Sequence, residues 1–137
     1  MTYPFVDTDI IIRLLTGDDL EKQAAASALF KKVEQGLLTV QASDTVIADA
    51  IYVLASPRLY HVARNDIRDI LVTLITLPQF LLHNREDVLR ALDIYASTKL
   101  DFGDALIIAS MKQSGSHVLY SYDRDFDRIP SLTRQEP

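Results

Sequence analysis

The chain has 137 residues, 48% of them hydrophobic and 24% charged, which is typical of one soluble globular domain with a sizeable core. It contains no Cys, so disulfides and thiolate zinc sites are excluded, and its most apolar stretch, residues 70–82, is too short to cross a membrane. The net charge of −5 neither supports nor excludes a nucleic-acid partner, because the acids can gather in one pocket while basic residues lie elsewhere. The first residues lack the features of a secretory signal, so we expect a cytoplasmic protein.

The first half of the chain is predicted to alternate strands and helices. Gly17 and Gly36 end two helical patterns, and Pro57 follows a third. Ser43 or Asp44 can cap the third helix. The predicted elements are a strand at residues 3–7, helices at 8–15 and 20–35, a strand at 37–41, and a helix from residue 43 or 44 to residue 55.

The second half repeats this alternation. An amphipathic helix begins near Asn65 and ends before Pro78, and Gly115 closes a later helix. The other predicted elements are a strand at 79–82, helices at 85–97 and from 101 or 102 to 113, a strand at 117–121, and a short edge strand at 131–134.

Short apolar strands separated by helices are typical of a mainly parallel sheet covered by helices. We therefore predict an α/β fold in which residues 1–137 form a single domain with a mainly parallel central sheet of four to five strands wrapped by helices. In such sheets, ligands bind beyond the carboxyl ends of the strands. Side chains that follow the strands are therefore the first candidates for a functional site.

Five acidic residues lie where an apolar run ends or a helix begins, or inside an apolar helix: Asp7, Asp49, Asp101, Asp104 and Asp123. A carboxylate in such a place is costly unless something offsets its charge. Hard divalent cations prefer oxygen ligands of this kind. The set therefore indicates a metal-dependent enzyme, whose metal must be held by oxygen because the three His residues show no ligand spacing.

Each acid also has a structural explanation. Asp7 can cap the helix that follows it. Asp101 and Asp104 are three residues apart, so one can cap a helix while the other occupies its first turn. Asp123 can belong to a polar turn. Asp49 is the hardest to explain by capping, because it lies inside its helix on an apolar stripe where we expect it to be buried.

Five blocks of the sequence resemble, in order and spacing, the motifs of PIN domains, and most closely those of the VapC-type ribonuclease toxins of prokaryotic toxin–antitoxin pairs. The blocks are residues 5–9 (FVDTD), 14–18 (LLTGD), 46–54 (VIADAIYVL), 100–109 (LDFGDALIIA) and 118–126 (VLYSYDRDF). Each block is degenerate, but the ordered set is specific and spans nearly the whole chain. The resemblance implies a PIN-like fold.

Carried over position by position, the resemblance implies a set of acidic site residues. Asp7 and Asp104 match the principal metal ligands of the family, and Asp123 matches the last acid of the pocket, so these three are the expected metal ligands. Asp49 matches a position usually held by Glu. These four acids are the expected catalytic residues, with Asp101 as an accessory acid.

Two further positions are accessory. Ser121 matches a Ser or Thr that, in the family, orients metal-bound water or a neighbouring carboxylate. Asp9 stands where Asn is more common. The Asp at position 49 is one methylene shorter than Glu, which leaves the number of bound metal ions open.

The resemblance implies a ribonuclease that uses Mg²⁺ or Mn²⁺ to hydrolyse RNA and leaves 5′-phosphate and 3′-hydroxyl ends. It also implies a homodimer and an antitoxin protein that covers the site. We expect no membrane partner, because the most apolar segment is too short to span a membrane. The apolar helices at residues 46–54 and 67–77 offer a groove or a dimer face, although core packing explains them equally well.

Two other functions remain open. Residues 7–9 superficially match the Asp-x-Asp start of haloacid-dehalogenase-type phosphatases, but the late helices offer only Lys99 and Lys112 to balance a phosphate, and neither follows a strand. Alternatively, the chain is a catalytically weak PIN-fold module that acts mainly by binding protein or RNA.

Overall fold

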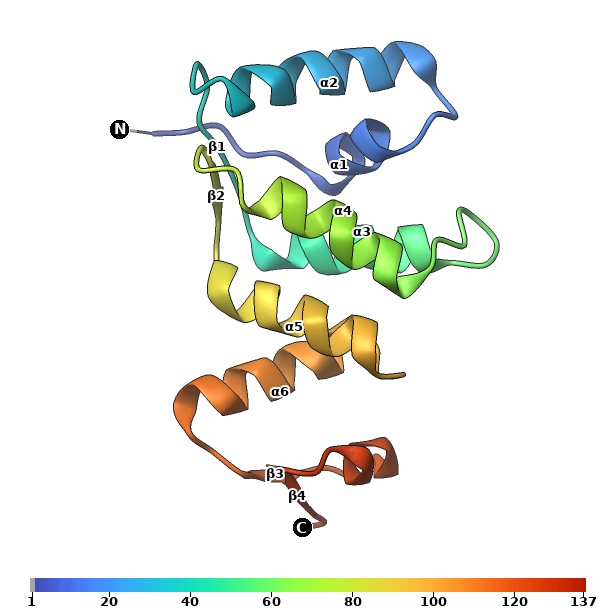
Figure 1. Ribbon diagram of the computed structural model, residues 1–137, viewed down its shortest axis with the longest axis vertical. Coiled ribbons are helices and arrows are strands. Elements are labelled where there is room, and N and C mark those ends of the chain that lie inside the picture. Colours follow the sequence, from blue (N-terminus) through green and yellow to red (C-terminus); the bar gives the residue numbers. More distant parts are fainter. Residues whose placement is uncertain (1) are drawn as a thin grey trace.

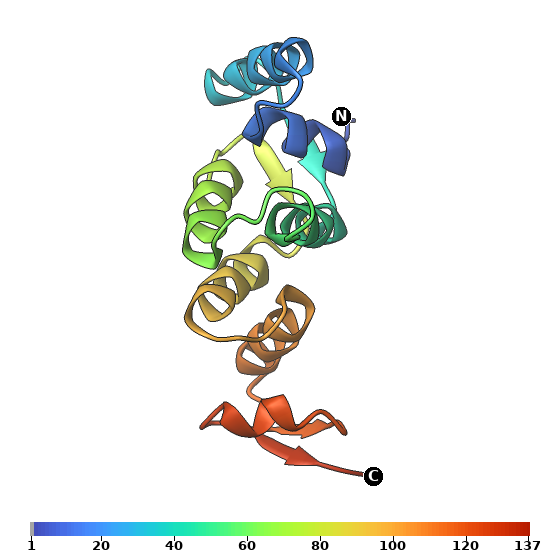
Figure 2. The same ribbon diagram turned by 90° about the vertical axis from the view of Figure 1, so that its right-hand side faces the viewer.

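The structure, a computed structural model, describes residues 2–137; the predicted domain also includes Met1, which lies outside these residues. Six helices are stacked along the long axis of an elongated molecule (Figure 1). A view turned by 90° shows the same column (Figure 2). In chain order the helices are α1 (Thr8–Leu15), α2 (Leu20–Glu34), α3 (Asp44–Ala55), α4 (Arg64–Ile75), α5 (Arg85–Ser97) and α6 (Phe102–Ser114).

The predicted helices are confirmed because their signals are local. Asp19 caps α2 by accepting a hydrogen bond from the N–H of Lys22, at 3.0 Å. Gly115 ends α6 with a φ of 75°, a left-handed conformation that glycine adopts without a steric penalty. The structure also contains a short 3-10 helix, η1 (Arg124–Arg128), which the sequence did not predict and which lies where a polar turn was expected.

The strands are shorter than predicted and form two separate sheets. β1 (Val40–Ala42) pairs with β2 (Phe80–Leu82), and β3 (Val118–Tyr120) pairs with β4 (Thr133–Gln135), both in parallel. The α/β class and the parallel pairing are therefore as predicted. The single central sheet of four to five strands is not formed within the described residues, because β3 and β4 lie at the far end of the column from β1 and β2 (Figure 1).

The predicted strand at residues 3–7 is reduced to one bridge between Phe5 and Gln41. The Val6 N–H donates to the Gln41 carbonyl at 3.0 Å, and the Gln41 N–H donates to the Pro4 carbonyl at 2.9 Å. The segment therefore lies beside β1 and extends the β1–β2 sheet on that side.

The main hydrophobic core lies between the helices and the β1–β2 sheet. Burying a side chain such as Ile47, Leu71 or Phe80 stabilises the fold by about 1.5–3 kcal/mol. The inner faces of α3 and α4 belong to this core, so core packing accounts for most of the apolar residues that could have formed a groove.

A second, smaller core supports the β3–β4 sheet. It consists of Leu100, Ile108 and Phe126, with Leu119 and Ile129 packed against it. Because α6 supplies Ile108 to this core and Phe102, Ala105 and Ala109 to the main core, α6 holds the two parts of the molecule together. Across residues 2–137, no helix is both long enough and apolar enough to cross a membrane.

Candidate active site

The first group of predicted site residues lies between α1 and α3. Asp7, Asp9 and Asp49 line one groove of about 470 Å³, together with Arg13 and Tyr60 from the surrounding elements. Asp7 is the N-cap of α1, and its Oδ1 accepts a hydrogen bond from the Thr8 N–H at 2.7 Å. The capping role that the sequence suggested for Asp7 is therefore confirmed, and it leaves the other carboxylate oxygen free of this bond.

We expected Asp49 to be buried, but it is exposed. The side chain is exposed, whereas its neighbours Ile47, Ala50 and Ile51 point into the core. The apolar stripe of α3 therefore passes beside Asp49 rather than through it. Exposure removes the desolvation cost that made this carboxylate conspicuous in the sequence.

The second group lies at the start of α6. Asp101 is the N-cap of α6 and accepts a hydrogen bond from the Asp104 N–H at 2.8 Å. Burial raises the pKa of Asp104 above its ordinary value of 3.8, and the negative charges of Asp101, Asp123 and Asp125 raise it further. The elements after α6 therefore bring two more carboxylates near the start of that helix.

Asp123 and Ser121 occupy the turn between β3 and η1. The Ser121 hydroxyl accepts a hydrogen bond from the Asp123 N–H at 3.0 Å, and Asp123 Oδ1 accepts one from the Asp125 N–H at 2.9 Å. These bonds hold Asp123 at the N-cap of η1. The sequence did not identify Asp125 as a site residue, because it was only one acid of an expected polar turn. Its charge acts on Asp104 because the chain after α6 folds back toward the start of that helix.

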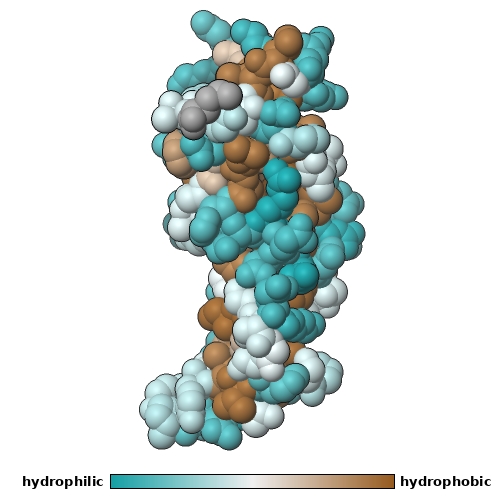
Figure 3. Space-filling model, turned by 90° about the vertical axis from the view of Figure 1, so that its left-hand side faces the viewer, coloured by the Kyte–Doolittle hydropathy of each residue, from teal (hydrophilic) through white to brown (hydrophobic). Residues whose placement is uncertain are grey.

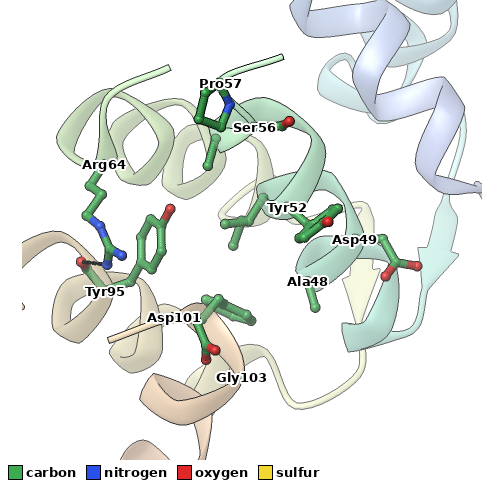
Figure 4. A pocket seen from close by; sticks show the side chains of 12 residues that line it. Ala48, Asp49, Tyr52, Ser56, Pro57, Arg64, Tyr95, Asp101 and Gly103 are labelled. Atoms are coloured by element: carbon green, nitrogen blue, oxygen red, sulfur yellow. Dashed lines mark hydrogen bonds between the residues drawn. The ribbon is translucent and has the colours of Figure 1, made fainter. Parts of the chain in front are cut away.

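A cavity of about 550 Å³ lies between α3 and the start of α6. Asp49 of α3 and Asp101 at the start of α6 both line it, and Figure 4 shows that their carboxylates do not point toward each other. Tyr52, Tyr95 and Phe102 supply much of the remaining wall. The acids are thus divided between two elements that face the same cavity from different sides.

Within the described residues of one chain, the expected metal ligands are not gathered around a single position. Within the part of the chain that the structure describes, no three acidic or His side chains are grouped so that they can share a metal ion. The expected ligands Asp7 and Asp104 belong to different groups, and only Asp104 and Asp123 interact through their charges. We therefore assign no step of a reaction to a metal in this arrangement.

Arg64 is a structural residue that the sequence did not reveal as one. Its guanidinium lies over the Tyr95 ring, 4.2 Å from the centroid, and donates hydrogen bonds to the carbonyls of Tyr95, Thr98, Lys99 and Leu100. Figure 4 shows this residue at the wall of the cavity. Arg64 therefore fixes the loop that carries Asp101. The sequence around Arg64 contains no pattern that predicts this role.

Asp18, in the second of the matched sequence blocks, is also structural. The Tyr60 hydroxyl donates a hydrogen bond to it at 2.7 Å, and Arg13 forms a salt bridge with it at 3.3 Å. The Tyr60 hydrogen bond is the largest cause that lowers the pKa of Asp18, and Thr16 and Arg13 lower it further. Asp18 therefore connects the end of α1 to the loop before α4.

The comparisons with known proteins define the family. The sequence model of the PIN-domain family matches residues 5–132 of this chain. The chain therefore belongs to the PIN-domain family. Among curated proteins, no sequence matches this chain. Among solved structures, a toxin–antitoxin complex from Klebsiella pneumoniae is similar at 20% identity, over 96% of each chain, with a low TM-score of 0.34.

Proposed function

We propose that this protein is an endoribonuclease of the PIN family that requires Mg²⁺ or Mn²⁺ and serves as the toxin of a toxin–antitoxin pair. Family membership supports the nuclease class. The observation that carries the proposal is the group of carboxylates around Asp104: burial raises the pKa of Asp104, and the negative charges of Asp101, Asp123 and Asp125 raise it further. Carboxylates that crowd in this way at a partly open site are typical of catalytic centres.

In the part of the chain that the structure describes, this group has no salt-bridge partner. Among the described residues, none forms a salt bridge with Asp101, Asp104, Asp123 or Asp125, although Asp127 of the same 3-10 helix is paired with Arg134 at 2.8 Å. An excess of negative charge without a protein partner is what a bound cation would stabilise. We propose direct roles for Asp7, Asp104 and Asp123, with Asp49 as a fourth catalytic acid.

The accessory residues have positioning roles in this proposal. Asp101 holds the first turn of α6, and therefore the backbone of Asp104, through its capping hydrogen bond. Ser121 holds the backbone of Asp123 in the same manner. Asp9 adds negative charge to the groove that contains Asp7.

A groove beside the second group offers cations for an RNA backbone. It has a volume of about 410 Å³ and is lined by Lys99 from the α5–α6 loop and by Asp125 and Arg128 from η1. Phosphates are held mainly by Lys and Arg, so a strand of RNA in this groove would have its backbone close to the acids at the start of α6. Lys99 does not line the groove that contains Asp7, so no observation favours the phosphatase alternative.

We propose an antitoxin as the protein partner. Within residues 2–137 the acids around Asp104 form no salt bridge, and a basic side chain of a second protein is complementary to them. Co-expression with a small DNA-binding protein encoded next to this gene tests the proposal: a stable complex that suppresses RNA cleavage is expected. Full cleavage activity in the presence of that protein contradicts it.

The nuclease itself is tested by incubating the purified protein with RNAs of varied sequence and Mn²⁺ and mapping the cut ends. Asp7→Asn and Asp104→Asn should each reduce cleavage by at least about a hundredfold while the protein stays folded. Asp93→Asn is the matched control, because Asp93 is an exposed acid of α5 outside both groups. Cleavage by either site variant at the parental rate contradicts the assignment, and RNA binding without metal-dependent cleavage supports the binding-module alternative instead.

A further inference from the structure

Two strand edges lack partners among the described residues, 2–137. Because Pro4 and Val6 use their backbone groups to bond Gln41, the N–H and carbonyl of Phe5 point to the opposite side, where they bond to no residue in the range 2–137. In the β3–β4 ladder, Ser121 and His117 bond toward β4. The backbone groups of Val118 and Tyr120 therefore point away from β4.

Both edges also expose hydrophobic side chains. Phe5 is 69% exposed at the first edge, and Val118 and Tyr120 are 45% and 67% exposed at the second. Figure 3 shows hydrophobic side chains on one face of the molecule, both at the level of the β1–β2 sheet and near the β3–β4 end. Parallel sheets of two strands are marginal without further pairing or cover, and open edges of this kind are templates for another strand.

The two edges cannot meet within one chain unless a packed core is broken. They lie at different levels of the column (Figure 1), and α6 between them is packed into both cores. If β3 moved to the first edge, Leu100, Ile108 and Phe126 would no longer pack together. A second copy of the chain can supply its β3 edge while this small core stays intact.

We propose that two copies of this chain pair edge to edge, with residues 3–7 of each copy parallel to β3 of the other. The free backbone groups set the register, with Phe5 opposite Leu119 and three new hydrogen bonds. The Phe5 N–H donates to the Val118 carbonyl, the Tyr120 N–H to the Phe5 carbonyl, and the Asp7 N–H to the Tyr120 carbonyl.

The result is a parallel sheet of five strands in the order β2, β1, residues 3–7, then β3 and β4 of the second copy. This number lies within the four to five strands that the sequence led us to expect in one chain. A twofold axis across the long axis would satisfy both pairs of edges at once, which is the closed symmetry that most homodimers have.

The same register explains why the acids are divided. It places Asp7 opposite Ser121 of the second copy and two residues from the level of its Asp123, which interacts with Asp104 through charge. Each site would therefore combine acids of both copies. This consequence rests on the proposed function, whereas the pairing of the edges does not.

The absence of native Cys allows a direct test by cross-linking. Pro4 and Val118 are opposite each other in the proposed register, and both are exposed. When Pro4→Cys and Val118→Cys proteins are mixed and oxidised, we expect a disulfide-linked heterodimer. Leu59→Cys, exposed and distant in sequence from both edges, replaces Pro4→Cys in the control mixture. Cross-linking no greater than in the control overturns the proposal, as does a double variant that cross-links only within one chain.

Light scattering gives a second measurement on the unmodified protein. The mass should be twice 15.4 kDa. Tyr120→Pro removes the N–H that points to the second copy and should shift the protein to monomer, while Tyr120→Thr keeps that N–H and most of the dimer. A wild-type monomer at all concentrations overturns the proposal.

Complementation tests the shared site. In an equal mixture of Asp7→Asn and Asp104→Asn proteins, a heterodimer contains one intact site, so RNA cleavage should recover to about a quarter of the wild-type rate. No recovery overturns a site shared between copies. Wild-type protein without cleavage would instead refute the proposed function and leave the cross-linking result as the test of the pairing.

Discussion

The Asp104 N–H donates a capping hydrogen bond of 2.8 Å to the Asp101 carboxylate. Asp101, the N-cap of α6, therefore holds the carboxylate of Asp104, whose pKa is raised, close to its own carboxylate. One carboxylate stabilises the helix terminus, and the two together repel. Because the capping contribution and the repulsion arise from the same side chain, substitutions can separate them.

Asp104 should make the folded state less stable as pH rises. Its pKa in the fold is raised above the ordinary value of 3.8, so the folded state binds the proton more tightly than the unfolded state. Stability is therefore lost as pH rises from 3.8 through the raised pKa. Asp104→Asn should melt at a higher temperature than wild type at neutral pH, and the difference should disappear below this window. Equal melting temperatures at every pH would contradict the electrostatic description of this group.

The cap of α6 is tested by two variants of Asp101 that carry no charge. Asp101→Asn can still accept the hydrogen bond from the Asp104 N–H, whereas Asp101→Ala cannot. We expect the Ala variant to be less stable than the Asn variant by about 1 kcal/mol in urea unfolding. Because both variants remove the repulsion with Asp104, the difference between them reports the cap alone. Identical free energies of unfolding would show that the cap contributes nothing.

Arg64 should matter more to stability than its position at the start of α4 suggests. Replacement by Met leaves the carbonyls of the α5–α6 loop without their charged donor, with an expected cost of about 2 kcal/mol. Arg68→Met is a control in the same helix, because Arg68 only forms a surface pair with Asp69 and should cost less than about 1 kcal/mol. Urea unfolding of both variants measures the difference. Similar losses in the free energy of unfolding would refute the role of Arg64 in stabilising the α5–α6 loop.

Lys99 and Arg128 should govern RNA affinity rather than the rate of cleavage. Replacing either by Ala should raise the KM for RNA with kcat nearly unchanged. The slope of log affinity against log salt should become shallower by about one for each phosphate that the variant no longer neutralises. Lys31→Ala, on the exposed surface of α2, is the control. A fall in kcat with an unchanged KM would contradict a role in RNA binding.

Mn²⁺ should raise the melting temperature, because a ligand that binds only the folded state stabilises it. Asp104→Asn should abolish most of the shift, and a chelator should reverse it. If two copies complete the site, the shift should also increase with protein concentration. The absence of any shift at millimolar Mn²⁺ would count against a metal site in either arrangement.

The helices and their ends were predictable from the sequence because their causes are local. The Asp that caps a helix and the Gly that ends it lie within a few residues of the groups they satisfy, as Asp101 and Gly115 do. The positions of the acidic residues relative to these ends were predictable for the same reason. The family itself was recognisable because ordered blocks of sequence preserve this local pattern.

Only the tertiary structure decided which strands pair and which acids meet. Pairing of parallel strands is non-local, and nothing near Val118 in the sequence determines that β3 pairs with β4 in the chain. The packing of α6 into two cores separates the sheets, and with them Asp7 from Asp104. The burial of Asp49 was mispredicted for a related reason: the packing of α3 against its neighbours turns Ile47, Ala50 and Ile51 into the core and leaves Asp49 exposed.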